Sequence, residues 1–226
     1  AGARRMLAAM PPVAALWREL GAIRPALVHT NSTKMHLMAG AAARLRRLPV
    51  IWHMRDLMTD PDARAWLRRA VNRIRPEVIA ISDAVAGQFE GMPCNVRVVP
   101  NGIPIDSFEP GPPPDGLREE LGLPESVPVA CVVGRLTPWK GHRTLLRAWP
   151  GVLGRIPDAH LLIVGEVAFW GDDYGAELRS LAEELGVEDR VVWAGFRDDV
   201  PEILRLVDLL VLASKDEPFG RVVIGG

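Results

Sequence analysis

Two cations and two glycines are gathered in one short loop of the second half of the chain. Gly134, Arg135, Lys140 and Gly141 follow the apolar run VPVACVV and precede a helical pattern. An arginine grips phosphate oxygens with its planar guanidinium and a lysine adds a mobile point charge, while the N terminus of the next helix presents free N–H groups to an anion. Such a loop can hold a pyrophosphate. Taken alone it is moderately specific, because a single surface cation is usually just a solvated charge.

Two later loops of the same half also carry side chains that could bind a ligand. Phe196 and Arg197 follow the run RVVWAG and precede a helix that Asp198 or Asp199 is expected to cap. Glu217 follows the run DLLVLAS, and a carboxylate next to helix N-terminal amides can bind a polyol together with its anionic leaving group. The simpler interpretation of Glu217 is an exposed loop acid.

The elements that position these loops alternate along the chain. Apolar runs alternate with helical patterns in both halves, and runs such as Val78 to Ile81 are continuously apolar, which is typical of parallel strands. The sequence predicts an α/β protein with two doubly wound parallel-sheet domains at 1–108 and 127–226, joined by a Pro- and Gly-rich linker at 109–126. Ligands of such sheets bind beyond the carboxyl ends of the strands, where the three loops lie.

Charge and composition restrict the class of protein. The first 108 residues hold 15 basic and 8 acidic residues, a net charge of +7, and the remainder holds 12 and 20, a net charge of −8. No apolar run is long enough to cross a bilayer, which predicts a cytoplasmic protein. Cys94 and Cys131 lie far apart in sequence without further ligand-rich segments, which argues against a disulfide framework and a zinc site.

Nine arginines between Arg44 and Arg75 make the first half strongly basic. The segment RAWLRRAVNRIR is helix-like, with Trp66, Ala70 and Ile74 on one face. A solvated face is the usual explanation, and the open alternative is peripheral contact with anionic lipid at the inner face of the membrane or with a phosphorylated lipid acceptor. No nucleic-acid recognition motif accompanies the charge, so nucleic acid is not expected as a partner.

Two further features of the first half concern the chemistry and the join between domains. His53 comes at the end of the apolar run VIWHM, where a strand histidine is either a hydrogen-bonded core residue or a group at a ligand site. Asn101 and Gly102 follow the run VRVVP and predict a turn with positive φ, at a place suited to a hinge.

The combination of segments, in this order, resembles glycosyltransferase family 4, a large group of retaining enzymes with the GT-B fold. The segments that carry the resemblance are VHTNS, WHMRDL, VIAISDAV, VVPNGI, VGRLTPWKG, WAGFRDDVP and SKDEPFG. The resemblance implies two Rossmann-like domains facing a cleft. It implies transfer of a hexosyl group from a nucleoside-diphosphate sugar to a hydroxyl of a glycan, lipid or small molecule, with retention and with neither a metal ion nor another cofactor.

The resemblance also implies roles for individual residues. Gly134, Arg135 and Lys140 would bind the donor diphosphate, and Phe196 and Arg197 would lie at the nucleobase.

The donor sugar and the reacting centre would involve a second set of residues. Glu217, Phe219 and Gly220 would bind the donor sugar, and His53 and Glu217 would be the catalytic residues.

The sequence departs from the family pattern at both ends. Nothing before ALVHTN matches the family's glycine-rich first turn, and the position eight residues after Glu217, where the family holds the ribose with a second glutamate, is Gly225. With Gly226 following, we expect a truncated chain and two incomplete domains. Two alternatives stay open: a GT-B-type sugar-nucleotide epimerase, which would share the phosphate site, and a non-catalytic fragment that binds a sugar nucleotide, which the departures at the two ends favour.

Overall fold

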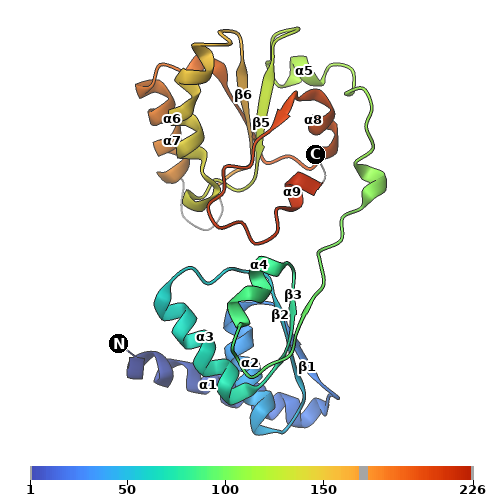
Figure 1. Ribbon diagram of the computed structural model, residues 1–226, viewed down its shortest axis with the longest axis vertical. Helices are drawn as coiled ribbons and strands as arrows, with labels where there is room; N and C mark the ends of the chain where they lie inside the picture. The colour runs from blue at the N-terminus through green and yellow to red at the C-terminus, as the bar shows by residue number, and fades with distance from the viewer. Residues whose placement is uncertain (1, 168–172, 225–226) are drawn as a thin grey trace. The chain divides into compact units, whose positions relative to one another are not determined.

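The computed structural model describes residues 2–167 and 173–224, with side chains from residue 12 onward. The chain divides into two compact units, Ala1–Asn101 and Gly102–Gly226 (Figure 1). The predicted positive φ at the junction is wrong, because neither Asn101 nor Gly102 adopts it. Within the described part of the chain, every helix is too short or too polar to span a bilayer.

The first unit is built on a parallel sheet of four strands in the order β1-β2-β3-β4. Its elements are α1 (Gly2–Ile23), β1 (Val28–Thr30), α2 (Thr33–Leu45), β2 (Val50–Met54), α3 (Pro61–Ile74), β3 (Glu77–Ala80), α4 (Asp83–Ala86), η1 (Gly87–Phe89) and β4 (Val96–Val98).

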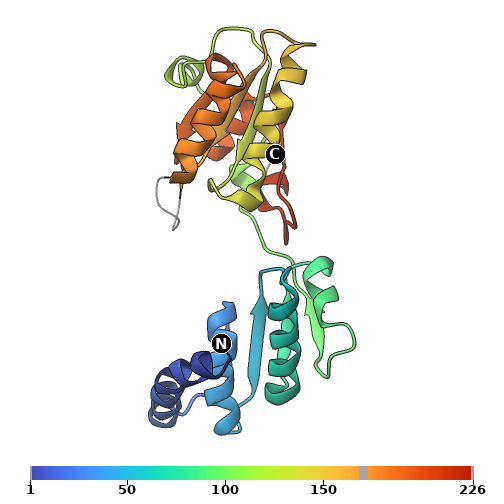
Figure 2. The same ribbon diagram turned by 90° about the vertical axis from the view of Figure 1, so that its left-hand side faces the viewer.

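Helices α2 and α3 cover one face of this sheet (Figure 2). Gly40 of α2 lies against Trp52 of β2 and Ile74 of α3, so the absence of a side chain at Gly40 lets all three elements meet. Helix α3 begins at Pro61, where the carboxylate of Asp60 accepts a hydrogen bond from the Ala63 N–H and Pro61 occupies the first turn.

The second unit is also a parallel sheet, with strand order β7-β6-β5-β8. Its elements are η2 (Ile105–Ser107), α5 (Leu117–Glu120), β5 (Val129–Val133), η3 (Pro138–Lys140), α6 (His142–Leu153), β6 (His160–Val164), α7 (Asp173–Glu184), η4 (Glu188–Arg190), β7 (Val191–Gly195), α8 (Val200–Leu206), β8 (Leu209–Leu210) and α9 (Arg221–Ile224).

Helices cover both faces of this second sheet, which confirms the predicted α/β class. Alternate strand residues such as Leu161 and Leu162 point to opposite faces, where one packs with α6 and α7 and the other with α5 and α8. Part of the predicted linker belongs to this packing, since Leu117, Leu121 and Leu123 are buried in the second core. The exact domain boundaries stay a prediction.

Candidate functional site

The loops at the carboxyl ends of the second sheet are tied to one another by backbone hydrogen bonds. The Gly134 N–H donates to the Val164 carbonyl over 2.9 Å, which joins the ends of β5 and β6. The Gly165 N–H donates to the Gly195 carbonyl over 2.7 Å, which joins the ends of β6 and β7. These two hydrogen bonds hold together the loops that follow β5, β6 and β7.

Two glycines make the close approach of these loops possible. A Cβ atom on Gly141, whose φ is +79°, would lie 1.9 Å from the carbonyl oxygen of Ala213, which follows β8. A Cβ atom on Gly165, whose φ is +138°, would lie 2.1 Å from the carbonyl oxygen of Gly134. A side chain at either position would meet backbone rather than a flexible side chain, so both positions require glycine.

The predicted diphosphate-binding lysine and sugar-binding glutamate meet where these loops converge. The Lys140 Nζ lies 2.7 Å from Glu217 Oε2, and each side chain is only about a fifth exposed, at 22% and 20%. The methylene groups of Lys140 pass over Gly134, where an added Cβ would lie 3.6 Å from them. The Gly220 N–H donates to Glu217 Oε1 over 3.3 Å. The structure thus brings Gly134, Lys140, Glu217 and Gly220 together.

The protonation of Glu217 follows from this pairing. Burial acts to raise the pKa of its carboxyl group, but the hydrogen bonds that the carboxyl group accepts, that of Lys140 first, together with the charge of Lys140 outweigh burial and hold the pKa below its ordinary value. Glu217 is therefore a carboxylate at neutral pH. Charge on both partners lets either one exchange its present partner for a polar or anionic ligand.

The remaining predicted donor residues lie beside this pair. Arg135 follows Gly134 directly, and its side chain is exposed. Phe219 is half-buried next to the buried Gly220, whose φ is +76°. Glycine is suited to this backbone conformation, which precedes the start of α9.

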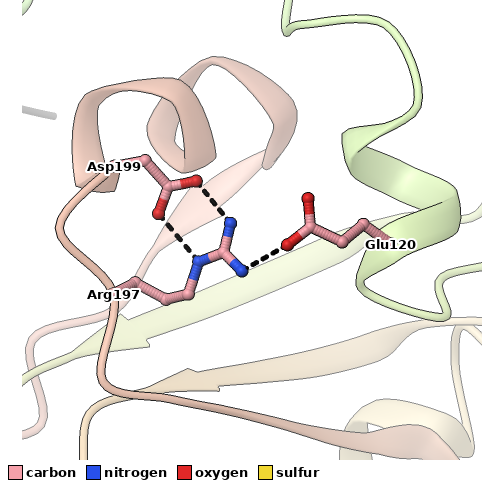
Figure 3. Close-up of polar contacts among 3 residues, drawn as sticks. All are labelled: Glu120, Arg197 and Asp199. Carbon is pink, nitrogen blue, oxygen red and sulfur yellow. Dashed lines mark hydrogen bonds and ion pairs between the residues drawn. The ribbon is translucent and has the colours of Figure 1, made fainter.

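The predicted base-binding residues have contrasting surroundings. Phe196 is 70% exposed directly after β7. The neighbouring Arg197 donates from Nε and Nη2 to both carboxylate oxygens of Asp199, over 2.7 and 2.5 Å, and from Nη1 to Glu120 of α5 over 2.5 Å (Figure 3). The hydrogen bonds to Asp199, and to a smaller extent the one to Glu120, raise the pKa of Arg197. The hydrogen bonding of Arg197 in turn lowers the pKa of Asp199.

The expectation that Asp198 or Asp199 caps α8 with its side chain is not met. Asp199 occupies the position before the helix, but its side chain makes no capping hydrogen bond. Its two oxygens bind the Arg197 guanidinium instead, because a bidentate pair with a charged donor is stronger than a bond to a neutral backbone N–H.

Sequence reasoning also missed three residues around the site. Glu120 is 77 positions from Arg197, so no local pattern links the two. Ala213 contributes only backbone to its contact with Gly141. His142, the first residue of α6, is fully buried directly behind the Lys140–Gly141 turn, and burial lowers its pKa to about 4, so its ring is neutral at pH 7.

His53 lies in the first unit, on β2. Its ring stacks on that of His29 from β1, with centroids 5.9 Å apart. Burial, and then the neighbouring charge of Arg55, lowers the pKa of His53, so the imidazole is neutral at pH 7. The adjacent Trp52 points to the opposite, helix-covered face and packs on His36, a buried histidine hydrogen-bonded to Thr30. His53 is therefore not part of that core.

Each half of the chain matches a known protein family. Residues 1–107 match the family described as Glycosyltransferase Family 4, and residues 115–225 match the family described as Glycosyl transferases group 1. The chain is 34% identical over 150 residues to D-inositol 3-phosphate glycosyltransferase of Corynebacterium jeikeium, which covers 64% of this chain and 36% of that protein. It therefore spans about a third of that relative's length.

Solved structures show the same architecture. The HepE protein of Anabaena, solved with UDP and glucose, superposes with a TM-score of 0.81 at 29% identity, over 94% of this chain and 59% of that one. Sucrose-phosphate synthase of Thermosynechococcus elongatus shares the fold, with a TM-score of 0.72 at 24% identity, over 94% and 56%. From the two family matches, the relatives and this fold, the chain belongs to the family 4 type of glycosyltransferases with the GT-B fold.

Proposed function

We propose that this chain carries the donor site of an enzyme that transfers a hexosyl group from a nucleoside-diphosphate sugar to an acceptor hydroxyl, with retention of anomeric configuration. The observation that carries the proposal is the Lys140–Glu217 pair at the convergence of the strand-end loops. A cation for a diphosphate and a carboxylate for sugar hydroxyls are the two groups that a sugar nucleotide requires side by side.

The donor diphosphate would be held without a metal ion. Lys140 would leave Glu217 and pair with a phosphate oxygen, and the exposed Arg135 would close on the other phosphate with its planar guanidinium. The N terminus of α6, directly after Gly141, adds backbone N–H groups and the positive end of a helix dipole. These charges stabilise the leaving diphosphate as the glycosidic bond breaks, which is electrostatic catalysis.

The sugar and the base would lie on either side of the diphosphate. Released from Lys140, Glu217 can accept hydrogen bonds from sugar hydroxyls beside the backbone of Phe219 and Gly220. Phe196 offers an exposed ring to the base, whereas the Arg197 guanidinium is already taken by two carboxylates and would hold the loop in place. We propose UDP as the nucleotide, because HepE, 29% identical over 94% of this chain, was solved with UDP.

The transfer step would proceed by attack of the acceptor hydroxyl from the face that the leaving group vacates. The acceptor oxygen forms the new bond to the anomeric carbon as the bond to the diphosphate breaks, and the acceptor proton passes to a phosphate oxygen of the leaving group. Neutral His53 would donate or accept a hydrogen bond at the reacting sugar. The acceptor would be a glycan, a lipid or a small molecule.

Product analysis tests this proposal. The chain is incubated with UDP-glucose or UDP-galactose and a panel of acceptors, and the sugar products are separated and assigned by NMR. We expect a new α-linked glycoside, abolished by Lys140→Ala and preserved in Lys215→Ala, a control in the Glu217 loop. An epimerised sugar nucleotide without acceptor product would replace transfer by epimerase activity, and binding without any product would leave only a donor-binding function.

A further inference from the structure

An apolar groove with a cationic rim lies among three helices of the first unit. Its volume is about 620 Å³, and Val13 of α1, Leu37 of α2 and Trp66 of α3 are among its apolar walls. The charged residues that line it are Arg44, Arg69 and Arg73, and none of its lining residues among those described is acidic. The groove therefore combines apolar surface with a net positive charge.

The apolar walls of this groove remain open to solvent. Leu45 at the end of α2 is 70% exposed, and Trp66 is 41% exposed. The guanidinium of Arg69 lies over the Trp66 ring, with its carbon 5.7 Å from the ring centroid, so charge and apolar surface alternate at close range. Exposed leucine and tryptophan in one concave patch mark an interaction surface rather than ordinary scattered exposure.

The charge of α3 is asymmetric along its length. Its one acidic residue, Asp62, stands in the first turn, and Arg64, Arg68, Arg69 and Arg73 follow with exposed side chains. Arg69 and Arg73 are one turn apart and so lie on the same side of the helix. Long arginine side chains can rest their methylene groups on apolar surface while their charged heads reach outward.

We propose that this groove docks the chain on an anionic phospholipid bilayer, with Leu45 and Trp66 at the boundary between headgroups and acyl chains and Arg44, Arg69 and Arg73 on lipid phosphates. Basic residues beside leucine and tryptophan on one helical surface are typical of segments that lie in a membrane interface. Three arginines and no acidic residue among the described lining complement the phosphates of an anionic bilayer. The proposal does not depend on the donor site.

Vesicle co-sedimentation tests the docking surface. The chain is mixed with vesicles of phosphatidylcholine alone or of phosphatidylcholine with phosphatidylglycerol, at low and high salt. We expect binding only to the anionic vesicles, weakened by salt. Arg69→Gln with Arg73→Gln should weaken partitioning by about 25-fold, or about fivefold per arginine. The matched control is Arg147→Gln with Arg155→Gln, two exposed arginines of the second unit, which should bind like the wild type.

Three results would overturn the proposal. They are equal binding to both kinds of vesicle, equal losses in the groove and control variants, and no binding to the anionic vesicles. The third result includes a chain that instead self-associates or binds an acidic helical peptide through Trp66. Circular dichroism melts of every variant verify folding. If the double arginine variant is unfolded, Leu45→Ser provides the test instead, because this largely exposed side chain should affect vesicle binding and not stability.

Discussion

Lys140 and Arg197 are both cations held by carboxylates at the strand ends of the second unit, but they are held differently. Lys140 pairs with one carboxylate, that of Glu217, through a single close contact. Arg197 makes three hydrogen bonds to two carboxylates, those of Asp199 and Glu120. A ligand phosphate can replace one partner of a point charge more readily than it can dismantle a fork bound on three donors. We interpret the lysine as exchangeable and the arginine as structural.

The Lys140–Glu217 pair can form only while the loop carrying Lys140 stays packed on the loop carrying Glu217. Gly141→Ala should break that packing. The new Cβ would meet the Ala213 carbonyl at 1.9 Å with φ at +79°. We expect a loss of about 3 kcal/mol or more in the free energy of unfolding, measured by urea denaturation.

Gly151→Ala is the matched control for this prediction. Gly151 lies in α6, and a Cβ there meets nothing within 4 Å. Replacement by alanine should stabilise the helix by about 0.5 to 1 kcal/mol. If Gly141→Ala behaves like Gly151→Ala, the tight approach of the two loops is wrong.

Arg197→Ala tests whether this arginine has a structural role. It leaves Asp199 and Glu120 without their shared partner, and because these carboxylates are partly exposed, we expect a loss of only about 1 kcal/mol in the free energy of unfolding. Inorganic pyrophosphate should bind with unchanged affinity in isothermal titration calorimetry. A loss of pyrophosphate affinity as large as that of Lys140→Ala would make Arg197 a phosphate ligand and remove the distinction.

Glu217→Gln should have the smallest effect on stability, and that effect should depend on pH. The pKa of Glu217 is lowered in the folded chain, so its pairing stabilises the fold above the ordinary pKa of 4.5 and this contribution is lost as the pH falls through the folded value. We expect the wild type to exceed the variant by less than about 1 kcal/mol at pH 7. The difference should begin to shrink as the pH falls below about 4.5 and should vanish only below the lowered pKa of the folded chain, as followed in urea titrations. A difference that grows toward acid would contradict the assigned pairing.

Local patterns in the sequence predicted much of this molecule. The alternation of apolar runs and helical patterns predicted both parallel sheets. The apolar run before Gly134 and the helical pattern after Gly141 also predicted that the cationic loop joins a strand to a helix, as it does between β5 and α6. These features are local, since each depends on residues within one or two turns of one another.

Contacts between distant segments could not be predicted. Glu120 reaches Arg197 only because α5 packs on the second sheet, in a region predicted as linker from its Pro and Gly content. The same contact network diverts Asp199 from its expected capping role. Asn101 and Gly102 show the converse error, because residues that favour positive φ do not require it. The roles of the individual site residues stay predictions.

Calorimetric titration of UDP into the wild-type chain, Lys140→Ala and Lys215→Ala tests whether Lys140 binds the donor diphosphate. Lys140 is the cation that we propose exchanges Glu217 for a phosphate. A hydrogen bond to a charged group contributes about 1.5 to 3 kcal/mol of free energy. The account predicts that Lys140→Ala weakens UDP binding by about 10-fold to 100-fold, while Lys215→Ala binds UDP like the wild type. Equal UDP affinity in the wild type and Lys140→Ala would contradict it.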